Sequence, residues 1–194
     1  MRTRTPFAVS AEVKTVAILT FVGIAIFATA SAAAVYHSRE SALELAFGQD
    51  AEVTSQELFL SKQEQAAAGK LAGSDIPSRL IRRYEGRQDG QLLGYAYFET
   101  HLVRSLPETL MIVVDPEGRV IGVHMLAFHE PEEYLPRDWF MEQFAGRELD
   151  KRLSVRTDLK GIAGSTFTAI AINGGVRRVL ATHQTLNART AGRH

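Results

Sequence analysis

Hydroxyl and glycine residues gather just before the last apolar segment of the chain. Residues 160–180 read KGIAGSTFTAIAINGGVRRVL, and Gly164, Ser165, Thr166 and Thr168 stand where an apolar helical pattern begins. Side-chain oxygens of Ser and Thr cap helices by accepting hydrogen bonds from the unpaired N–H groups of the first turn. The same N–H groups and the positive end of the helix dipole also attract a phosphate. The stretch therefore predicts either a capped helix or a phosphate site.

Two other kinds of chemistry fit the sequence poorly. His124, His129 and Glu130 suggest a metal site, but five residues of strand place the two histidines on opposite faces, and the spacing matches no zinc pattern. Ser165 lacks the second glycine of a nucleophile elbow, so serine hydrolysis is not indicated. The acidic, proline-interrupted segment 128–136 reads as a solvated loop, although loops of this kind also carry functional sites.

A pair of glycines lies in the middle of the predicted last helix. Gly174 and Gly175 follow Asn173, and a glycine inside a helix costs about 1 kcal/mol relative to alanine. Close packing of the helix backbone on a sheet would explain the pair. The alternative is that a bulky planar ligand or another chain approaches the helix closely.

The composition fits one globular domain with a short appendage. The chain has 194 residues, and its 22 basic residues balance its 22 acidic ones. Because no Lys/Arg block stands out, a nucleic-acid partner is not expected. The chain has no cysteine, which excludes disulfides, thiolate metal sites and thiol chemistry.

An apolar segment near the N-terminus is long enough to cross a membrane. Residues 15–38 carry no charge, and a helix of that length reaches roughly 36 Å against a hydrocarbon core of about 30 Å. We expect a transmembrane anchor at 15–37. The small residues of ATASAAA, at 28–34, offer the alternative of a cleaved signal peptide. Under either interpretation, the rest of the chain is expected to lie outside the cytoplasm.

The flanking charges orient this segment. Arg2, Arg4 and Lys14 precede it against a single acidic residue, Glu12, so residues 1–14 are expected in the cytoplasm. The predicted location is a bacterial inner membrane, crossed once, with the C-terminal domain in the periplasm.

The exported part mixes helices and strands. Residues 38–79 read as a helical or linker region, in which Ser61 opens a capping box and predicts a helix at about 61–71. The stretch TSQE at 54–57 is a second candidate helix start. Strands are expected at 80–84, 92–100, 110–114 and 119–128, with turns at EGRQDG and DPEG.

Two more helices complete the prediction. Trp139, Phe140 and Phe144 have helical spacing in 137–145, with Gly146 as the stop. The last helix should run from Thr166 to about residue 186, followed by a polar tail that we expect to be flexible at 189–194. The fold class is α+β: an N-terminal transmembrane helix, then a mostly antiparallel sheet with helices packed on it.

The stretch GIAGSTFT resembles the flavinylation motif of the FMN-binding domain family, commonly Asp-x-x-Ser/Thr-Gly-Ala-Thr. That family includes the C subunit of the sodium-translocating NADH:quinone oxidoreductase and the G subunit of the Rnf electron-transport complex. The resemblance covers roughly 92–186 and includes the strand, the His/Glu/Pro loop, the aromatic helix and its F-x-G stop. It identifies 80–188 as the FMN-binding domain.

The resemblance implies a covalent FMN. In the family a periplasmic flavin transferase attaches FMN through its phosphate to the last threonine of the motif, which is Thr166 here. Gly164 matches the motif glycine, and Thr168 a hydroxyl position that is frequent after it. Ser165 replaces Ala and keeps a small side chain there, as Ala163 does in place of Ser or Thr.

Position 160 is the serious departure from the motif. Lys160 stands where an aspartate that helps the transferase dock is usual. By resemblance, the loops LPET and FHEPEEYLP approach the cofactor, which makes Glu108, Thr109, His129 and Glu130 candidate contacts.

The expected function is electron transfer by a membrane-anchored flavoprotein. Its expected partners are the inner membrane, the flavin transferase and a membrane redox partner, either a quinone-linked complex or a cytochrome. The flavin would supply the redox chemistry, and no catalytic residue set of the protein's own is indicated. The alternative is a degenerate, unflavinylated domain that serves as an anchored assembly or binding subunit, which Lys160 favours.

Overall fold

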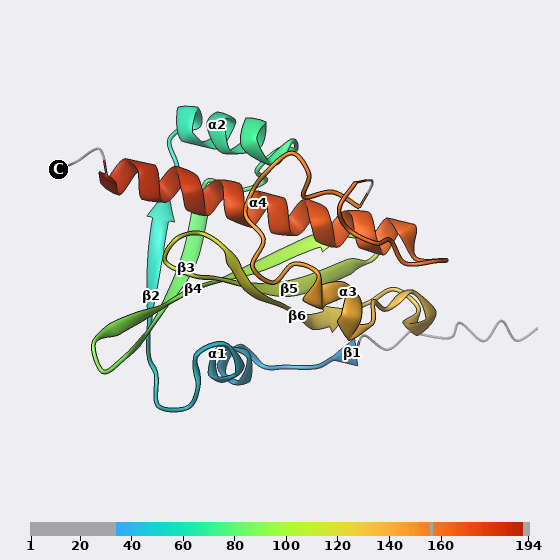
Figure 1. Ribbon diagram of the computed structural model, residues 1–194, viewed down its shortest axis with the longest axis horizontal. Coiled ribbons are helices and arrows are strands. Elements are labelled where there is room, and N and C mark those ends of the chain that lie inside the picture. The colour runs from blue at the N-terminus through green and yellow to red at the C-terminus, as the bar shows by residue number, and fades with distance from the viewer. Residues whose placement is uncertain (1–33, 156, 192–194) are drawn as a thin grey trace, which may run out of the picture. The chain divides into compact units, whose positions relative to one another are not determined.

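The computed structural model describes residues 34–155 and 157–191, and an antiparallel sheet lies at its centre (Figure 1). Within these residues the strand order is β1-β6-β5-β4-β3-β2, so each strand from β2 to β5 pairs with the next along the chain, and β6 also pairs with β1. The strands are β1 (Ala34–Val35), β2 (Glu52–Phe59), β3 (Leu80–Gln88), β4 (Gln91–Leu102), β5 (Pro107–Val114) and β6 (Val120–Phe128). The helices are α1 (Arg39–Phe47), α2 (Lys62–Ala72), η1 (Glu132–Tyr134), α3 (Asp138–Glu142) and α4 (Thr166–Ala191). The predicted α+β class with an antiparallel sheet is confirmed.

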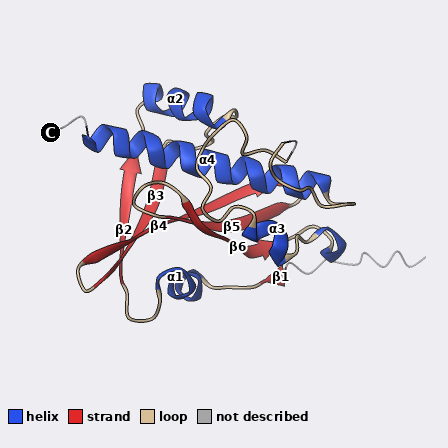
Figure 2. Ribbon diagram, in the orientation of Figure 1, coloured by secondary structure: helices blue, strands red, loops and turns tan. Residues whose placement is uncertain are grey.

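Helices cover both faces of the sheet (Figure 2). The long helix α4 crosses one face, with α2 beside it, and α1 lies against the other. The central strand β5 serves both layers, because successive side chains of a strand point to opposite faces. Leu110 and Ile112 pack toward α4, whereas Met111 and Val113 pack toward α1. This double burial explains why β5 is apolar without a break.

The apolar face of α4 holds it on the sheet. Ala169, Ile172, Val176 and Leu180 follow one another at spacings of three and four residues, and all are buried against the sheet. Burying each of the three larger side chains contributes about 1.5–3 kcal/mol, and burying Ala169 less. This packing positions the first turns of α4, where the candidate site begins.

The predicted hairpins are present, and their turns have the expected chemistry. In DPEG, the Gly118 N–H donates to the Asp115 carbonyl oxygen at 3.0 Å, and Gly118 has a φ of +91°. In the other hairpin β3 is longer than predicted, and Asp89 and Gly90 turn the chain with φ values of 51° and 78°. A left-handed pair of this kind suits a tight hairpin.

Two predictions from local patterns differ from the structure. The candidate helix start at 54–57 was wrong: these residues lie within β2, which pairs with β3 along its full length. A capping pattern is a local signal, and pairing with a neighbouring strand overrides it here. The last helix also continues beyond 186 to Ala191, through much of the polar segment.

The predicted membrane anchor lies almost entirely outside the described residues. Its last part is described, and there Ala34 and Val35 form β1, which pairs with β6. Residues 34–37 are therefore not helical, and the first two belong to the sheet. Among the residues that the structure describes, no helix combines the length and apolar character needed to cross a membrane.

Candidate functional site

Thr166 is the first residue of α4, and it is exposed to solvent. Gly164, two residues earlier, turns the chain with a φ of +80°, and outside its own chain neighbours no atom lies within 4 Å of the place where a side chain would begin. Ser165, between them, is only 4% exposed. The turn therefore buries its serine and presents its threonine to solvent.

Three backbone N–H groups at the start of α4 have no acceptor within the described residues. They belong to Thr166, Phe167 and Thr168. The next amide, that of Ala169, donates to the Ser165 carbonyl oxygen at 3.1 Å and begins the helical ladder. Free N–H groups together with the helix dipole favour an anion at this position.

Two other helices, α1 and α2, satisfy these groups with serine side chains, whereas the short helix α3 has no side-chain cap. Ser38 Oγ accepts from the first turn of α1, and Ser61 Oγ accepts from the first turn of α2, each at 3.1 Å. At the start of α4 no such side-chain bond occurs among the described residues. The hydroxyls of the motif therefore do not act as the ordinary helix cap that the sequence allowed.

No residue of the predicted LPET loop (106–109) lines the described space at the start of α4. Residues 103–104 and the predicted loop at 128–136 do lie against it. They leave a cavity of only about 10 Å³, roughly the volume needed for one water molecule. Its lining includes Val103, Arg104, Glu130, Tyr134, Gly164, Ser165, Phe167 and Thr168. The Arg104 guanidinium lies 4.9 Å from the centroid of the Phe167 ring, so these side chains occupy the space between the loops and the helix.

Glu130 ties one of these loops together. Its Oε1 accepts hydrogen bonds from the backbone N–H groups of Arg104, Ser105 and Leu106, at 3.1–3.2 Å. Donation from the Ser105 amide, supported by the other two, lowers the pKa of the Glu130 carboxyl below its ordinary value. The carboxylate therefore organises residues 104–106, and its Oε1 is already engaged.

The other predicted contacts also have partners inside the fold. His129 Nδ1 lies 3.0 Å from the Pro107 carbonyl oxygen. Thr109 Oγ1 lies 2.9 Å from Thr100 Oγ1 on the neighbouring strand. Glu108 is fully buried on β5. The structure thus uses these three residues within the sheet and loop framework. Of the four predicted contacts, only Glu130 lines the described space at the start of α4.

Glu108 pairs with a histidine that sequence reasoning missed. His101 Nε2 on β4 lies 2.7 Å from Glu108 Oε1, while Glu108 Oε2 and His101 Nδ1 have no hydrogen-bond partner. Burial raises the pKa of the Glu108 carboxyl, and the bond with His101 opposes that rise. The pair occupies opposite positions on adjacent antiparallel strands, a relationship that only strand register creates.

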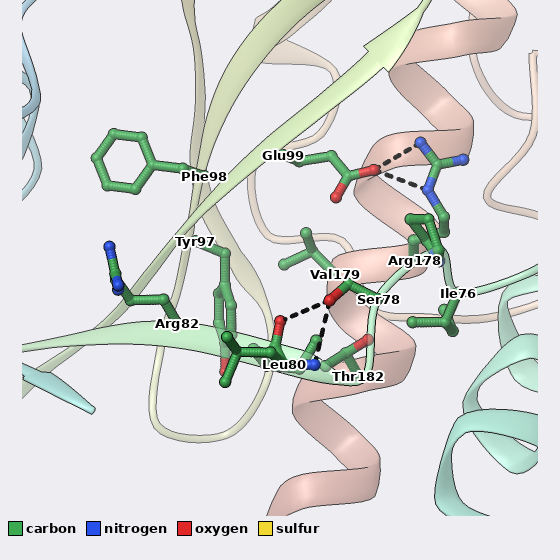
Figure 3. Close-up of a pocket in the computed structure, with 12 residues that line it drawn as sticks. Ile76, Ser78, Leu80, Arg82, Tyr97, Phe98, Glu99, Arg178, Val179 and Thr182 are labelled. Carbon is green, nitrogen blue, oxygen red and sulfur yellow. Dashed lines mark hydrogen bonds and ion pairs between the residues drawn. The ribbon is translucent and has the colours of Figure 1, made fainter. Parts of the chain in front are cut away.

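An ion pair continues this polar layer between the sheet and α4. Figure 3 shows Glu99 of β4 facing Arg178 of α4, and Glu99 Oε1 lies 2.7 Å from Arg178 Nε and 2.6 Å from Nη2. Glu99 Oε1 is also 3.8 Å from His101 Nδ1. A line of charged and polar side chains therefore runs from Arg178 through Glu99 and His101 to Glu108.

The glycine pair of α4 has two different surroundings. A Cβ atom at Gly175 would lie 2.9 Å from His101 Cε1 and 3.3 Å from Glu99 Cγ, so this glycine allows the close approach of helix and sheet. A Cβ atom at Gly174 would meet only Arg178 Nη1, at 3.3 Å. The packing explanation therefore holds for Gly175, and Gly174 lies on a more open side of the helix.

Gly174 opens onto a groove of about 600 Å³ along the first half of α4. We call it the α4 groove. The end of α2, the end of β4 and the loop 151–154 supply its other walls. Its lining comprises Ala72, Gly73, Ser74, His101, Leu102, Val103, Lys151, Leu153, Ser154, Phe167, Ile170, Ala171, Asn173, Gly174, Arg177 and Arg178. This lining contains no acidic residue.

Two side chains of α4 fix the walls of the groove. The Arg177 guanidinium donates to four backbone carbonyl oxygens, two at the end of α2 and two in the 150–153 segment. Asn173 Nδ2 donates to the Leu153 carbonyl oxygen at 3.2 Å. These bonds use the polar groups of Arg177 and Asn173, and hold segments that are distant in sequence around one hollow.

Lys160 lies on a loop that is held to the segment after α3. Its backbone N–H donates to Gln143 Oε1 at 2.7 Å, and its carbonyl oxygen accepts from Gln143 Nε2 at 3.1 Å. The loop is therefore anchored by its backbone, and Lys160 itself is exposed to solvent.

Sequence reasoning missed the residues that build the α4 groove. His101 and Leu102 lie far from the motif in sequence, Lys151 lies shortly before Lys160, and the three form no motif of their own. The one available signal was the glycine pair, which pointed to a close approach on α4 without indicating which glycine faces the open side.

Among the described residues, no group of three His, Asp or Glu side chains is placed to hold a metal ion.

Comparison with known proteins gives no family assignment. No family model matches this chain, and no curated protein matches it. Function is therefore inferred from the motif and from the geometry around α4.

Proposed function

We propose that this protein is a membrane-anchored, periplasm-facing flavoprotein that carries FMN on Thr166 and transfers electrons. The observation that carries the proposal is the exposed Thr166 at a helix start where three backbone N–H groups lack acceptors among the described residues. An ester at Thr166 Oγ1 would place the remaining phosphate oxygens beside these groups and the positive end of the helix dipole.

The residues present fit a phosphate-linked cofactor. Gly164 leaves open space beside the attachment point, and the α4 groove has room for an aromatic ring. When bound, the flavin supplies the one- and two-electron chemistry, and the protein holds and orients it.

The proposed location follows from the N-terminal sequence. Because Ala34 belongs to the sheet, a membrane-spanning helix would use residues 15–33, about 28 Å at 1.5 Å per residue. This length approaches the roughly 30 Å of a hydrocarbon core. An anchored domain of this kind would exchange electrons with a quinone-linked complex or a cytochrome in the same membrane.

Attachment is tested by mass spectrometry of the peptide that spans residues 161–177. The full chain is produced together with an active flavin transferase. Wild-type peptide should carry one added FMN on Thr166. Thr166→Ala should abolish covalent flavin while the protein still folds, and Thr168→Ala should retain at least part of it. FMN on Ser165 or Thr168, or no added mass with an active transferase, would refute the assignment.

An unflavinylated assembly subunit remains the competing function, and Lys160 is the feature that favours it. Lys160 puts a positive charge where the family's motif has a carboxylate. This alternative predicts no flavin on the wild-type chain even when a control substrate is modified by the same transferase.

The location has its own test. A reporter that is active only outside the cytoplasm, fused after His194, should be active, and the chain should stay in the membrane through a carbonate wash. Release of a shortened soluble form would show that 28–34 is a cleavage site.

A further inference from the structure

Large apolar side chains surround the α4 groove without being covered by the fold. Leu102 is 62% exposed, Phe167 59% and Ile170 45%, and all three line this one hollow. Exposed apolar residues that gather around a concave site are typical of a ligand-binding surface. We therefore take the groove as the candidate for the ring of the cofactor, an assignment that rests on the proposed function.

The helix geometry leads from Thr166 into the groove. Ile170 lies one turn further along the same face of α4, and Asn173 lies two turns further, because residues spaced by three, four and seven positions share a face. Gly174 is about 12 Å from Thr166 along the helix axis. The phosphate and five-carbon ribityl chain of FMN can follow this path.

Gly174 leaves the surface of α4 bare within the groove. A Cβ atom there would meet only the end of the Arg178 side chain, which already binds Glu99 through Nε and Nη2. A flat ring can therefore lie against the helix at this point. A side chain longer than that of alanine would prevent this contact.

The positive charge of Lys151 lines the groove and is not paired with another described group. Arg177 is bound to backbone carbonyls and Arg178 to Glu99, whereas the Lys151 ammonium has no hydrogen bond or ion pair within the described residues. Because the lining contains no acidic residue, the groove favours a negatively charged group.

We propose that the α4 groove holds the isoalloxazine ring of FMN attached to Thr166. The ring lies over Gly174, with Leu102 and Ile170 as apolar neighbours. Lys151 stabilises the negative charge that the ring gains when it is reduced at neutral pH, and so raises the reduction potential.

Filling the groove tests the ring position. Gly174→Leu and Ile170→Glu are made in the flavinylated full chain, with Gly174→Ala and Leu45→Glu as matched controls. Leu45 is an exposed leucine of α1, on the opposite face of the sheet.

The readouts are flavin fluorescence anisotropy and quenching of that fluorescence by iodide. Both groove variants should retain FMN on Thr166, lose anisotropy and become at least twice as sensitive to iodide, whereas both controls should match the wild type. Equal quenching and anisotropy in all five proteins would overturn the proposal.

The charge is tested separately. Lys151→Gln should lower the midpoint potential of the attached flavin, while Lys62→Gln on the exposed start of α2 should leave it unchanged. An unchanged potential in Lys151→Gln would remove Lys151 from the site.

Failure of attachment and failure of the groove give different results. If the wild-type chain carries no FMN, the proposed function fails, and the groove is then tested with riboflavin, which lacks the phosphate. Riboflavin binding that Gly174→Leu weakens at least tenfold supports a flavin-ring site. Absence of riboflavin binding to the unmodified chain would overturn it.

Discussion

Gly175 of α4 and His101 of β4 are in such close contact that a methyl group on the glycine would lie 2.9 Å from His101 Cε1. The contact brings the helix backbone onto the polar layer formed by Glu99, His101 and Glu108. The two adjacent glycines therefore have different surroundings: Gly175 contacts the sheet, and Gly174 faces the α4 groove. The pair therefore gives a direct test of the packing.

The two glycines should respond oppositely to alanine. Gly175→Ala should lower the free energy of unfolding by about 1–3 kcal/mol, because the added methyl overpacks the contact with His101 and Glu99. Gly174→Ala should raise it by up to about 1 kcal/mol, because alanine favours the helix and the end of Arg178 can move aside. Urea unfolding measures both. Equal changes in the free energy of unfolding for the two variants would contradict the different surroundings of Gly174 and Gly175.

His183 should make the domain lose stability in acid. Burial, helped by Arg83, lowers the pKa of His183 to about 4. Its Nε2 also accepts from Asn187 Nδ2 at 2.9 Å, a bond that a protonated ring cannot accept. The unfolded chain therefore binds a proton near pH 6.5 that the folded chain resists, and up to about 3 kcal/mol is lost as the pH falls from 7 to 4.

His183→Gln isolates this contribution. The variant has no group that titrates at this position, so its free energy of unfolding should fall less between pH 7 and pH 4 than that of the wild type. The comparison uses the pH dependence and not the absolute stability, because the bond between His183 Nδ1 and the Tyr97 hydroxyl is also lost. Parallel pH profiles would show that His183 does not resist protonation.

Glu108 should have the opposite pH signature. Because burial raises its pKa, the folded state holds a proton that the unfolded state releases, and stability declines as the pH rises above about 4.3, the ordinary value for Glu. Glu108→Gln should therefore gain stability relative to the wild type on going from pH 4 to pH 7.5. Urea titrations at both values measure the difference. A relative loss at pH 7.5 would mean that the bond with His101 outweighs burial.

Glu130 should control the order of the loop before β5. Glu130→Ala removes an acceptor of three backbone N–H groups and should lower the free energy of unfolding by about 1–3 kcal/mol. Hydrogen exchange at Arg104, Ser105 and Leu106 should accelerate, and Glu130→Gln should cause a smaller change because an amide oxygen still accepts. Glu133→Ala, at an exposed neighbour, serves as the control. Unchanged exchange in Glu130→Ala would contradict this role.

Lys160 should limit flavin attachment without affecting the fold. Its loop is held through backbone bonds to Gln143, so Lys160→Asp should leave the unfolding free energy nearly unchanged. The same change should increase the flavin content per chain obtained with a transferase that recognises the usual aspartate, and should lower the midpoint potential. Lys62→Asp controls for net charge. Unchanged occupancy and potential would mark Lys160 as an ordinary surface charge.

Local sequence signals correctly predicted the elements with strong chemistry of their own. The capping box at Ser61 starts α2, the DPEG turn joins β5 to β6, and the helix from Thr166 begins where the hydroxyl motif indicated. Each of these depends on neighbours within a few residues of chain. The same reasoning failed at 54–57, where a helix-start pattern lies in β2, because strand pairing is a contact between distant residues.

The sequence by itself determined the class of fold, the threonine motif at the start of the last helix and the presence of an unusual glycine pair. Only the tertiary structure decided that Gly175 faces the sheet and Gly174 the α4 groove, and that His101 meets Glu108. It also decided that Lys151 stands beside a helix that comes later in the chain. The physical reason is that these relationships depend on strand register and on helix rotation over the sheet, which the packing of residues far apart in sequence fixes.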